Sequence, residues 1–113
     1  MATPKEIAQR LSGALVVKTD KDGYKYWYLE GDLIKEESPY GDKHWYLNGL
    51  CHREDGPAIE YVNGSKEWYL KGKLHREDGP AVEYVYGRKE WWVNGNFIRE
   101  DGFLANSVRS SNG

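Results

Sequence analysis

A 23-residue repeat constrains the fold of this chain more than any other feature. The segment His-Arg-Glu-Asp-Gly-Pro-Ala at residues 52–58 recurs at residues 75–81, and a shorter copy without proline follows at 98–102. Trp-led aromatic segments keep the same spacing at Trp45, Trp68 and Trp91, with an earlier copy at Trp27 only 18 residues before Trp45. Short repeats of this kind stabilise one another by stacking, so we expect a repeat array with a continuous core.

Each unit has the pattern of antiparallel strands joined by tight turns. Asn63-Gly64 between two β-prone segments predicts a two-residue hairpin loop. Further two-residue turns are expected at Glu30-Gly31, Asn48-Gly49, Lys71-Gly72 and Asn94-Gly95. The register that follows makes Trp68 face both Ile59 and His75, Trp91 face Ile98, and Glu67 face both Glu60 and Arg76. It predicts two cross-strand ion triads, Glu60/Glu67/Arg76 and Glu83/Glu90/Arg99.

The fold class expected is all-β, an elongated and twisted antiparallel meander of repeated β-hairpins with a short N-terminal capping helix. Thr3-Pro4-Lys5-Glu6 resembles a capping box, which predicts that helix in a cap over residues 1–13. Residues 14–104 form the expected β-repeat domain, and residues 105–113 a flexible tail. A chain of 113 residues leaves room for one domain.

Strand alternation separates two rows of aromatic residues. The leading tryptophans share a face with Ile59, Val82 and Ile98, which we expect to be the core. The second aromatics of each pair are expected on the opposite face, with the Glu/Arg triads: Tyr28, Tyr46, Tyr69 and Trp92. Exposed aromatic and charged side chains compose protein interfaces. The candidate binding residues are therefore Tyr46, Tyr69 and Trp92 as anchors and Arg53, Arg76 and Arg99 for polar specificity; packing of the aromatics against neighbouring strands is the open alternative.

The sequence lacks a pattern that predicts catalysis. His52 and His75 are second-choice ligand contacts, because Ile98 occupies the same position in the last unit and indicates a packing role. Cys51, the one cysteine, aligns with Leu74 and Phe97 and is expected to be an apolar filler. Repeated glutamates beside arginines favour low carboxyl pKa values, unlike a general acid. We expect no enzyme, metal or cofactor.

Charge and hydropathy exclude further classes of function. The net charge of −2 arises from 16 basic and 18 acidic residues that are interspersed, which argues against duplex nucleic acid as a partner. The sequence contains no apolar run near the roughly 18 residues needed to cross a bilayer. Without the apolar segment of a signal peptide, the N-terminus favours a soluble, cytoplasmic protein.

The phrase Lys-Glu-Trp-Tyr-Leu-x-Gly-Lys-Leu-His-Arg-Glu-Asp-Gly-Pro-Ala at residues 66–81 resembles the variant MORN-like repeats of bacterial and phage proteins, some of them antitoxin-like. The resemblance spans residues 24–102 and fits best over 65–81. It implies a hairpin-based, twisted sheet, and more weakly a contact with protein or lipid.

Our first hypothesis for function is a protein-binding module, for example an antitoxin-like or phage-encoded inhibitor that occludes a surface of its partner. Sequestration of a nucleotide signal by arginines and aromatics is the alternative. A lipid-surface scaffold is a third class, disfavoured by the negative charge. We also expect a homodimer that covers the sheet edge near residues 97–103.

Overall fold

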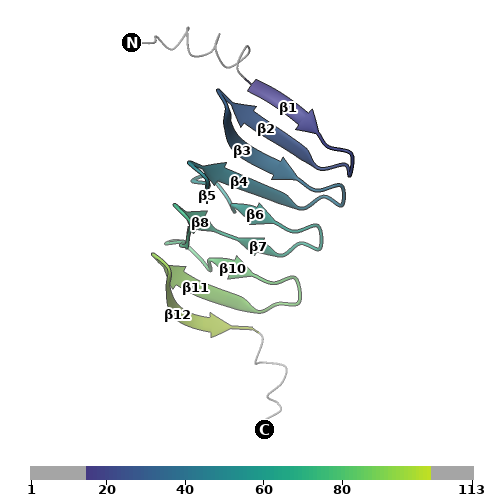
Figure 1. The fold of residues 1–113 in the computed structure, drawn as a ribbon. Coiled ribbons are helices and arrows are strands. Elements are labelled where there is room, and N and C mark those ends of the chain that lie inside the picture. The colour runs from purple at the N-terminus through teal and green to yellow at the C-terminus, as the bar shows by residue number, and fades with distance from the viewer. Residues whose placement is uncertain (1–14, 103–113) are drawn as a thin grey trace, which may run out of the picture.

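A computed structural model describes residues 15–102 and confirms an all-β, antiparallel, meander-like fold (Figure 1). The expected N-terminal helix and C-terminal tail lie outside the described residues. The strands are β1 (Leu15–Thr19), β2 (Lys25–Leu29), β3 (Asp32–Glu37), β4 (Lys43–Leu47), β5 (Leu50–Cys51), β6 (Ile59–Glu60), β7 (Lys66–Glu67), β8 (Tyr69–Leu70), β9 (Lys73–Leu74), β10 (Val82–Glu83), β11 (Lys89–Val93) and β12 (Asn96–Asp101). Residues 15–102 contain no helix, and so none that could span a membrane.

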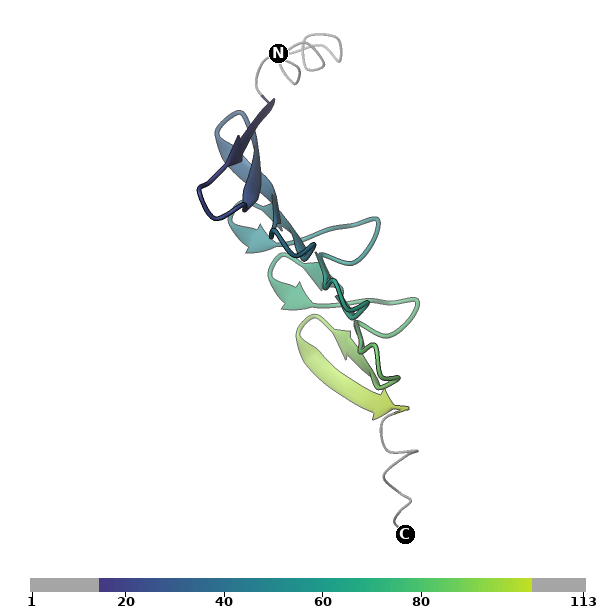
Figure 2. The same ribbon diagram turned by 90° about the vertical axis from the view of Figure 1, so that its right-hand side faces the viewer.

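The strands form one long, twisted layer. Its main path runs β1-β2-β3-β4-β6-β7-β10-β11-β12, and each neighbouring pair is antiparallel. Nine strands lie on this path, so the two outer strands, β1 and β12, point in the same direction (Figure 1). The molecule measures 61 × 35 × 18 Å, and no second layer of described residues covers either face of the sheet (Figure 2).

Two-residue turns join the strands at one side of the sheet, as expected. The first residue of each turn has a φ of 51°, at Glu30, Asn48, Lys71 and Asn94, and the glycine that follows has a φ of 80–89°. Positive φ at both central residues is the signature of a type I′ turn, whose twist matches that of the flanking strands. These turns fix the predicted register next to them, such as Tyr69 opposite Leu74.

The register predicted at Asn63-Gly64 is wrong by one residue. Tyr61 donates its N–H to Ser65, and Gly64 donates to Tyr61, so the loop has three residues and Gly64 alone takes a positive φ of 100°. A three-residue loop of this kind is a type I turn closed by a glycine bulge. Ile59 therefore faces Glu67 instead of Trp68, and Glu60 faces Lys66 instead of Glu67.

Two strands of the meander are split. β5 lies off the main path and pairs with β4, and β8 and β9 form a separate two-stranded ladder. After β5 and after β9 the chain leaves its ladder and enters the main path as β6 and β10, with five more residues at this point than the unsplit strand β3 has at its bulge. We call residues 52–57 and 75–80 the excursions; they project from one side of the sheet (Figure 2). Each excursion begins beside the next unit, where Arg53 donates its N–H to Tyr69 and Arg76 donates to Trp92, both at 3.1 Å. Arg76 therefore does not face Glu67, and the predicted Glu60/Glu67/Arg76 triad is wrong.

The unsplit strands β3 and β12 contain a bulge where the others have an excursion. The register shifts by one residue between Trp91 and Trp92, which leaves Ile98 without a facing residue and places Arg99 opposite Trp91. The expected Trp91–Ile98 and Glu90–Arg99 pairs are thus wrong, and with them the Glu83/Glu90/Arg99 triad. Glu90 faces Glu100, and Arg88 Nη2 bridges both carboxylates at 2.9 and 2.5 Å.

The core is small and lies in the middle of the sheet. The buried apolar residues of the described chain are Ala58, Ile59, Ala81 and Val82, whereas Ile98 is 56% exposed. Facing residues share a side of a sheet, and both Ile59 and Val82 face Glu67. The prediction that they lie with the leading tryptophans is therefore wrong, because a one-residue shift in register moves a side chain to the opposite face.

Candidate functional site

We call the two sides of the sheet the leading-Trp face and the second-aromatic face. The second-aromatic face carries Glu67 at its centre, which accepts hydrogen bonds from two phenols. Tyr69 Oη donates to Oε1 at 3.0 Å, and Tyr61 Oη donates to Oε2 at 3.2 Å. Tyr69 is half-buried and follows Glu67 by two residues, so both side chains lie on the same face of the sheet. The predicted separation of Tyr69 from Trp68 is confirmed.

The same arrangement repeats along this face. Tyr46 Oη donates to Glu36 at 3.3 Å and the ring stacks on His44, while Trp92 Nε1 donates to Glu90 at 2.9 Å. Phe97 packs edge-on against Trp92, with 5.3 Å between ring centroids. The three predicted anchors therefore form a row in which each ring is fixed by a carboxylate.

Burial and nearby carboxylates keep these phenols protonated. Burial, followed by the charge of Glu36, raises the pKa of Tyr46 to about 12. Burial and Glu67 raise the pKa of Tyr61 to about 12 and that of Tyr69 further above its ordinary value. The phenols remain hydrogen-bond donors at neutral pH, and they hold the glutamates in place.

The predicted specificity residues Arg53 and Arg76 lie on the leading-Trp face, apart from the aromatic row. The Arg76 guanidinium lies 3.9 Å from the Trp68 ring centroid. Its Nε donates to Asp78 at 3.1 Å, and its Nη1 donates to the Pro80 carbonyl and to Glu83 at 3.0 and 3.2 Å. Arg53 repeats this set with Trp45, Asp55, Pro57 and Glu60.

A glycine completes each arginine site. A Cβ on Gly79 would lie 2.9 Å from Arg76 Cζ, and one on Gly56 would lie 3.1 Å from Arg53 Cζ. The guanidinium is thus held between an indole ring and the backbone of its own excursion. This explains the Arg-Glu-Asp-Gly-Pro phrase: Asp and the Pro carbonyl accept from the guanidinium, and Gly leaves room for it.

In the unsplit strands, Arg99 and Lys35 supply the cation that lies over the leading tryptophan. Arg99 Cζ lies 3.7 Å from the Trp91 centroid, but its side chain is 56% exposed and its nearest carboxylate, Asp101, is 3.7 Å away. Lys35 Nζ lies 4.6 Å from the Trp27 centroid and 5.1 Å from that of Trp45. Every leading tryptophan therefore has a cation over its ring.

The second-choice contacts His52 and His75 join successive units. Nδ1 of His52 accepts from the backbone N–H of Lys71 at 2.8 Å, and Nδ1 of His75 accepts from Asn94 at 2.9 Å. Each imidazole thereby satisfies the first N–H of the next type I′ turn. Both side chains are close to fully buried, as a packing role predicts. Cys51 is half-buried opposite Tyr46, and burial raises the pKa of its thiol.

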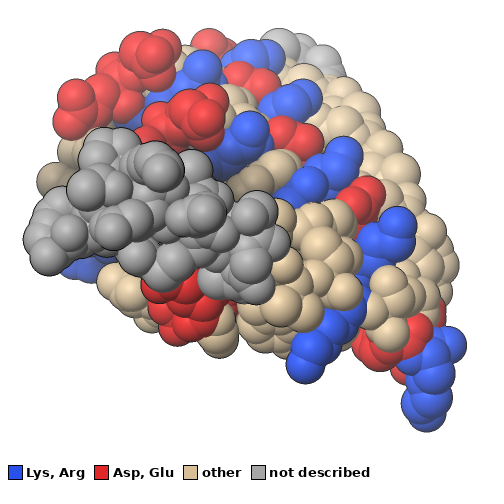
Figure 3. Space-filling view, turned by 90° about the horizontal axis from the view of Figure 1, so that it is seen from above, with Lys and Arg blue, Asp and Glu red and all other residues tan. Residues whose placement is uncertain are grey.

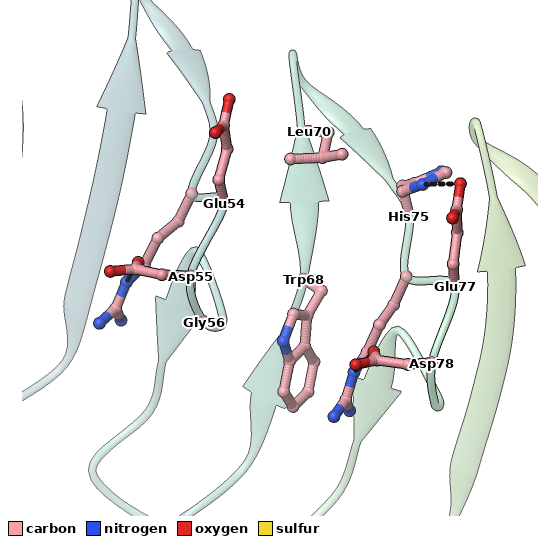
Figure 4. Close-up of a pocket in the computed structure, with 10 residues that line it drawn as sticks. Glu54, Asp55, Gly56, Trp68, Leu70, His75, Glu77 and Asp78 are labelled. Carbon is pink, nitrogen blue, oxygen red and sulfur yellow. Dashed lines mark hydrogen bonds and ion pairs between the residues drawn. The ribbon is translucent and has the colours of Figure 1, made fainter.

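A groove that the sequence did not reveal lies between the two excursions (Figure 4). It encloses about 580 Å³, with Trp68 and Leu70 at its floor and the excursions as its walls. The walls carry four carboxylates, Glu54, Asp55, Glu77 and Asp78, and the two structural guanidinium groups. A second hollow of about 610 Å³ adjoins it and shares Glu54 and Leu70. The tandem copies of Arg-Glu-Asp-Gly were the available signal, because two excursions must be neighbours to enclose a groove.

One view of the molecular surface carries charges of both signs. Seen from the N-terminal end, lysine and arginine side chains are interspersed with aspartate and glutamate (Figure 3). Among the described residues, no cluster of three or more His, Cys, Asp or Glu side chains has the geometry to hold a metal ion.

The comparisons give no relative from which a function could be transferred: no family model, no curated protein and no solved structure matches this chain.

Proposed function

We propose that this chain is a non-enzymatic protein-binding module that acts by occluding a surface of its partner, in the manner of an antitoxin-like or phage-encoded inhibitor. The observation that carries the proposal is the row of Tyr46, Tyr69 and Trp92 on the second-aromatic face. Each ring is half-buried and fixed by a carboxylate. Rigid aromatic anchors lose little conformational entropy on binding, which is why they dominate interface energetics.

The setting of these rings supports a macromolecular partner. A single-layer sheet leaves the row open on a broad surface, and no described element packs over it. Among residues 15–102, the carboxylates of the row accept from aromatic donors or pair with Arg88, which gives them a structural role there. A flat face with fixed aromatics suits a protein surface better than a small reacting molecule.

The charge of the groove weighs against the nucleotide alternative. Its walls hold four carboxylates and two guanidinium groups, and both guanidinium groups are already bound to carboxylates. A phosphate would meet a net negative wall. The arginines that suggested nucleotide binding are occupied in holding the excursions.

Affinity capture from the native host tests the proposal, with the full chain as bait and the Tyr46→Ala/Tyr69→Ala variant as comparison. Truncation of one interface anchor costs about 2 kcal/mol, so we expect the double variant to lose its partner at least tenfold. Tyr40→Ala, which alters a 71% exposed loop residue, is the matched control. Binding of the purified partner is then measured by calorimetry, on variants whose folding is verified by circular dichroism. Equal affinity of the double variant and the parent chain would refute the role of this face.

Self-association through β12 is part of the proposal. Phe97 and Ile98 on this outer strand are 50% and 56% exposed. Two copies related by a twofold axis would pair their β12 edges antiparallel, which is the pairing used throughout this sheet. Light scattering coupled to size exclusion should show a dimer that Ile98→Lys converts to a monomer; a parent chain that is monomeric at 100 μM, a concentration at which weak dimers still form, would reject it.

A further inference from the structure

We propose that the groove between the excursions is a second binding site, specific for a lysine or arginine side chain that a partner polypeptide presents. The groove lies on the leading-Trp face, opposite Tyr46, Tyr69 and Trp92, so this inference does not depend on the proposed function. Three observations lead to it: an indole ring with one uncovered side, a rim of carboxylates, and an internal contact of the same kind elsewhere in the sheet.

The internal contact is the one that Lys35 makes. Lys35 lies on β3 between β2 and β4, and its ammonium group approaches the rings of Trp27 and Trp45 at 4.6 and 5.1 Å. Trp45 also receives Arg53 at 4.0 Å from the excursion on the other side of β4. Trp45 thus has a cation from the segment before it and another from the segment after it.

Among the described residues, Trp68 has a cation only from the segment that follows it, and none from the segment before it. The sheet position between Trp45 and Trp68 that corresponds to Lys35 is occupied by Ala58, whose carbonyl accepts from Trp45 N–H. Arg76 covers Trp68 from the following excursion at 3.9 Å. Among the described residues no other cation lies over this ring, and the groove opens on the side of the preceding excursion (Figure 4).

The rim of the groove carries carboxylates that can pair with a positive charge. The side chains of Glu54 and Glu77 are each 82% exposed and lie 3.4 Å from the imidazoles of His52 and His75, and within residues 15–102 neither forms an ion pair with lysine or arginine. Their charges are therefore not neutralised by a permanent cation. A lysine or arginine side chain could lay its aliphatic part on Leu70 and Trp68, place its charge against the indole, and pair with the rim.

The indole N–H signals in an NMR spectrum provide the test. The probes are the peptides acetyl-Gly-Gly-Xaa-Gly-Gly-amide with Xaa as Arg, Lys or Gln, and Trp68→Phe identifies the Trp68 signal by its loss. We expect the Arg and Lys peptides to shift the Trp68 signal saturably, and the Gln peptide to leave it unmoved. The Trp45 signal, whose ring is already covered by Lys35 and Arg53, is the internal control.

Charge-reversal variants locate the site. Glu54→Lys/Glu77→Lys should raise the Kd of the Arg peptide at least tenfold, while Asp22→Lys/Asp32→Lys, an equal charge change at exposed positions away from the groove, should change it less than twofold. Tyr46→Ala/Tyr69→Ala should leave the peptide shift intact, which separates this inference from the proposed function.

Several outcomes would overturn the inference. These are the absence of a saturable Trp68 shift, an equal shift with the Gln peptide, and an equal loss of affinity in the two charge-reversal variants. Spermidine that displaces the Arg peptide at a concentration below the Kd of the peptide would assign the groove to small polyamines, and would reject a polypeptide side chain as its ligand.

Discussion

The N-terminal hairpins and the two excursion units use the same strands and turns but cover their tryptophans differently. In residues 15–47 the chain is a meander without excursions, and Lys35 lies over Trp27 and also approaches Trp45. In the excursion units, six residues leave the sheet to hold one arginine over one tryptophan. Six excursion residues take the place of one bulge residue, so each excursion unit has five more residues. In these units the flexible ammonium group of a lysine such as Lys35 is replaced by a guanidinium group that is held by several contacts. The excursions also give depth to a single-layer sheet, because a groove requires walls.

Removal of Arg76 should produce the largest difference between the two regions. Arg76→Ala leaves Glu83 and the Pro80 carbonyl without their donor and uncovers Trp68, so we expect a loss of about 2–3 kcal/mol in the free energy of unfolding. Lys35→Ala removes only ring contacts and should cost about 1 kcal/mol or less. Arg76→Lys should not restore stability, because an ammonium lacks the planar fork. Urea unfolding followed by tryptophan fluorescence measures this; equal losses at Arg76 and Lys35 would contradict it.

Loss of the His75 acceptor should rank second. His75→Ala leaves the Asn94 N–H unsatisfied at the start of its turn, which should cost about 1–2 kcal/mol. Ile98→Ala at the equivalent position of an unsplit strand should cost less than about 0.5 kcal/mol, since Ile98 is largely exposed. Hydrogen exchange at Asn94 should accelerate only in the histidine variant, and unchanged protection there would show that the imidazole does not join the units.

Alkaline pH should lower the stability of the fold, and the loss should arise on the second-aromatic face between β4 and β9. The pKa values of Tyr46 and Tyr61 are raised to about 12, so between about pH 10 and 12 the folded state retains protons that the unfolded state loses. Stability contributed by these phenols is complete below pH 10 and is lost as the pH rises through 12. Melting temperatures at pH 9 and 11.5, with phenolate absorbance as the titration signal, should show this. Titration of every tyrosine near 10 would contradict the buried hydrogen bonds.

The smallest effect is expected at the rim of the groove. Glu77→Gln removes an 82% exposed carboxylate, so unfolding should change by less than about 0.5 kcal/mol. The paired prediction is that the same variant weakens binding of the Arg peptide. A large loss of stability would indicate that Glu77 holds its excursion in place, as Asp78 does.

The sequence was sufficient for the features that local chemistry determines. The type I′ turns follow from the glycines of the four two-residue turns, and the separation of Tyr69 from Trp68 follows from strand alternation. The length of the loop at Asn63-Gly64 could not be predicted, because the same dipeptide occurs in two-residue and three-residue loops. The extra residue in this loop moved Ile59 to the other face, and the equivalent three-residue loop that ends at Gly87 moved Val82. The predicted facing partners of the arginines were wrong because the predicted register assumes an unbroken strand, whereas the strand is interrupted at each excursion.

The parallel directions of β1 and β12 bear on how such a chain can grow. Each 23-residue unit contributes two strands, so adding or deleting a unit restores the direction of the chain and changes the length by about 10 Å. The number of grooves is one fewer than the number of adjacent excursions. A longer array would therefore gain cation sites at a regular pitch, and its avidity for a basic segment with matching spacing would rise much faster than its length. With two excursions, this chain is the shortest array that has one such site.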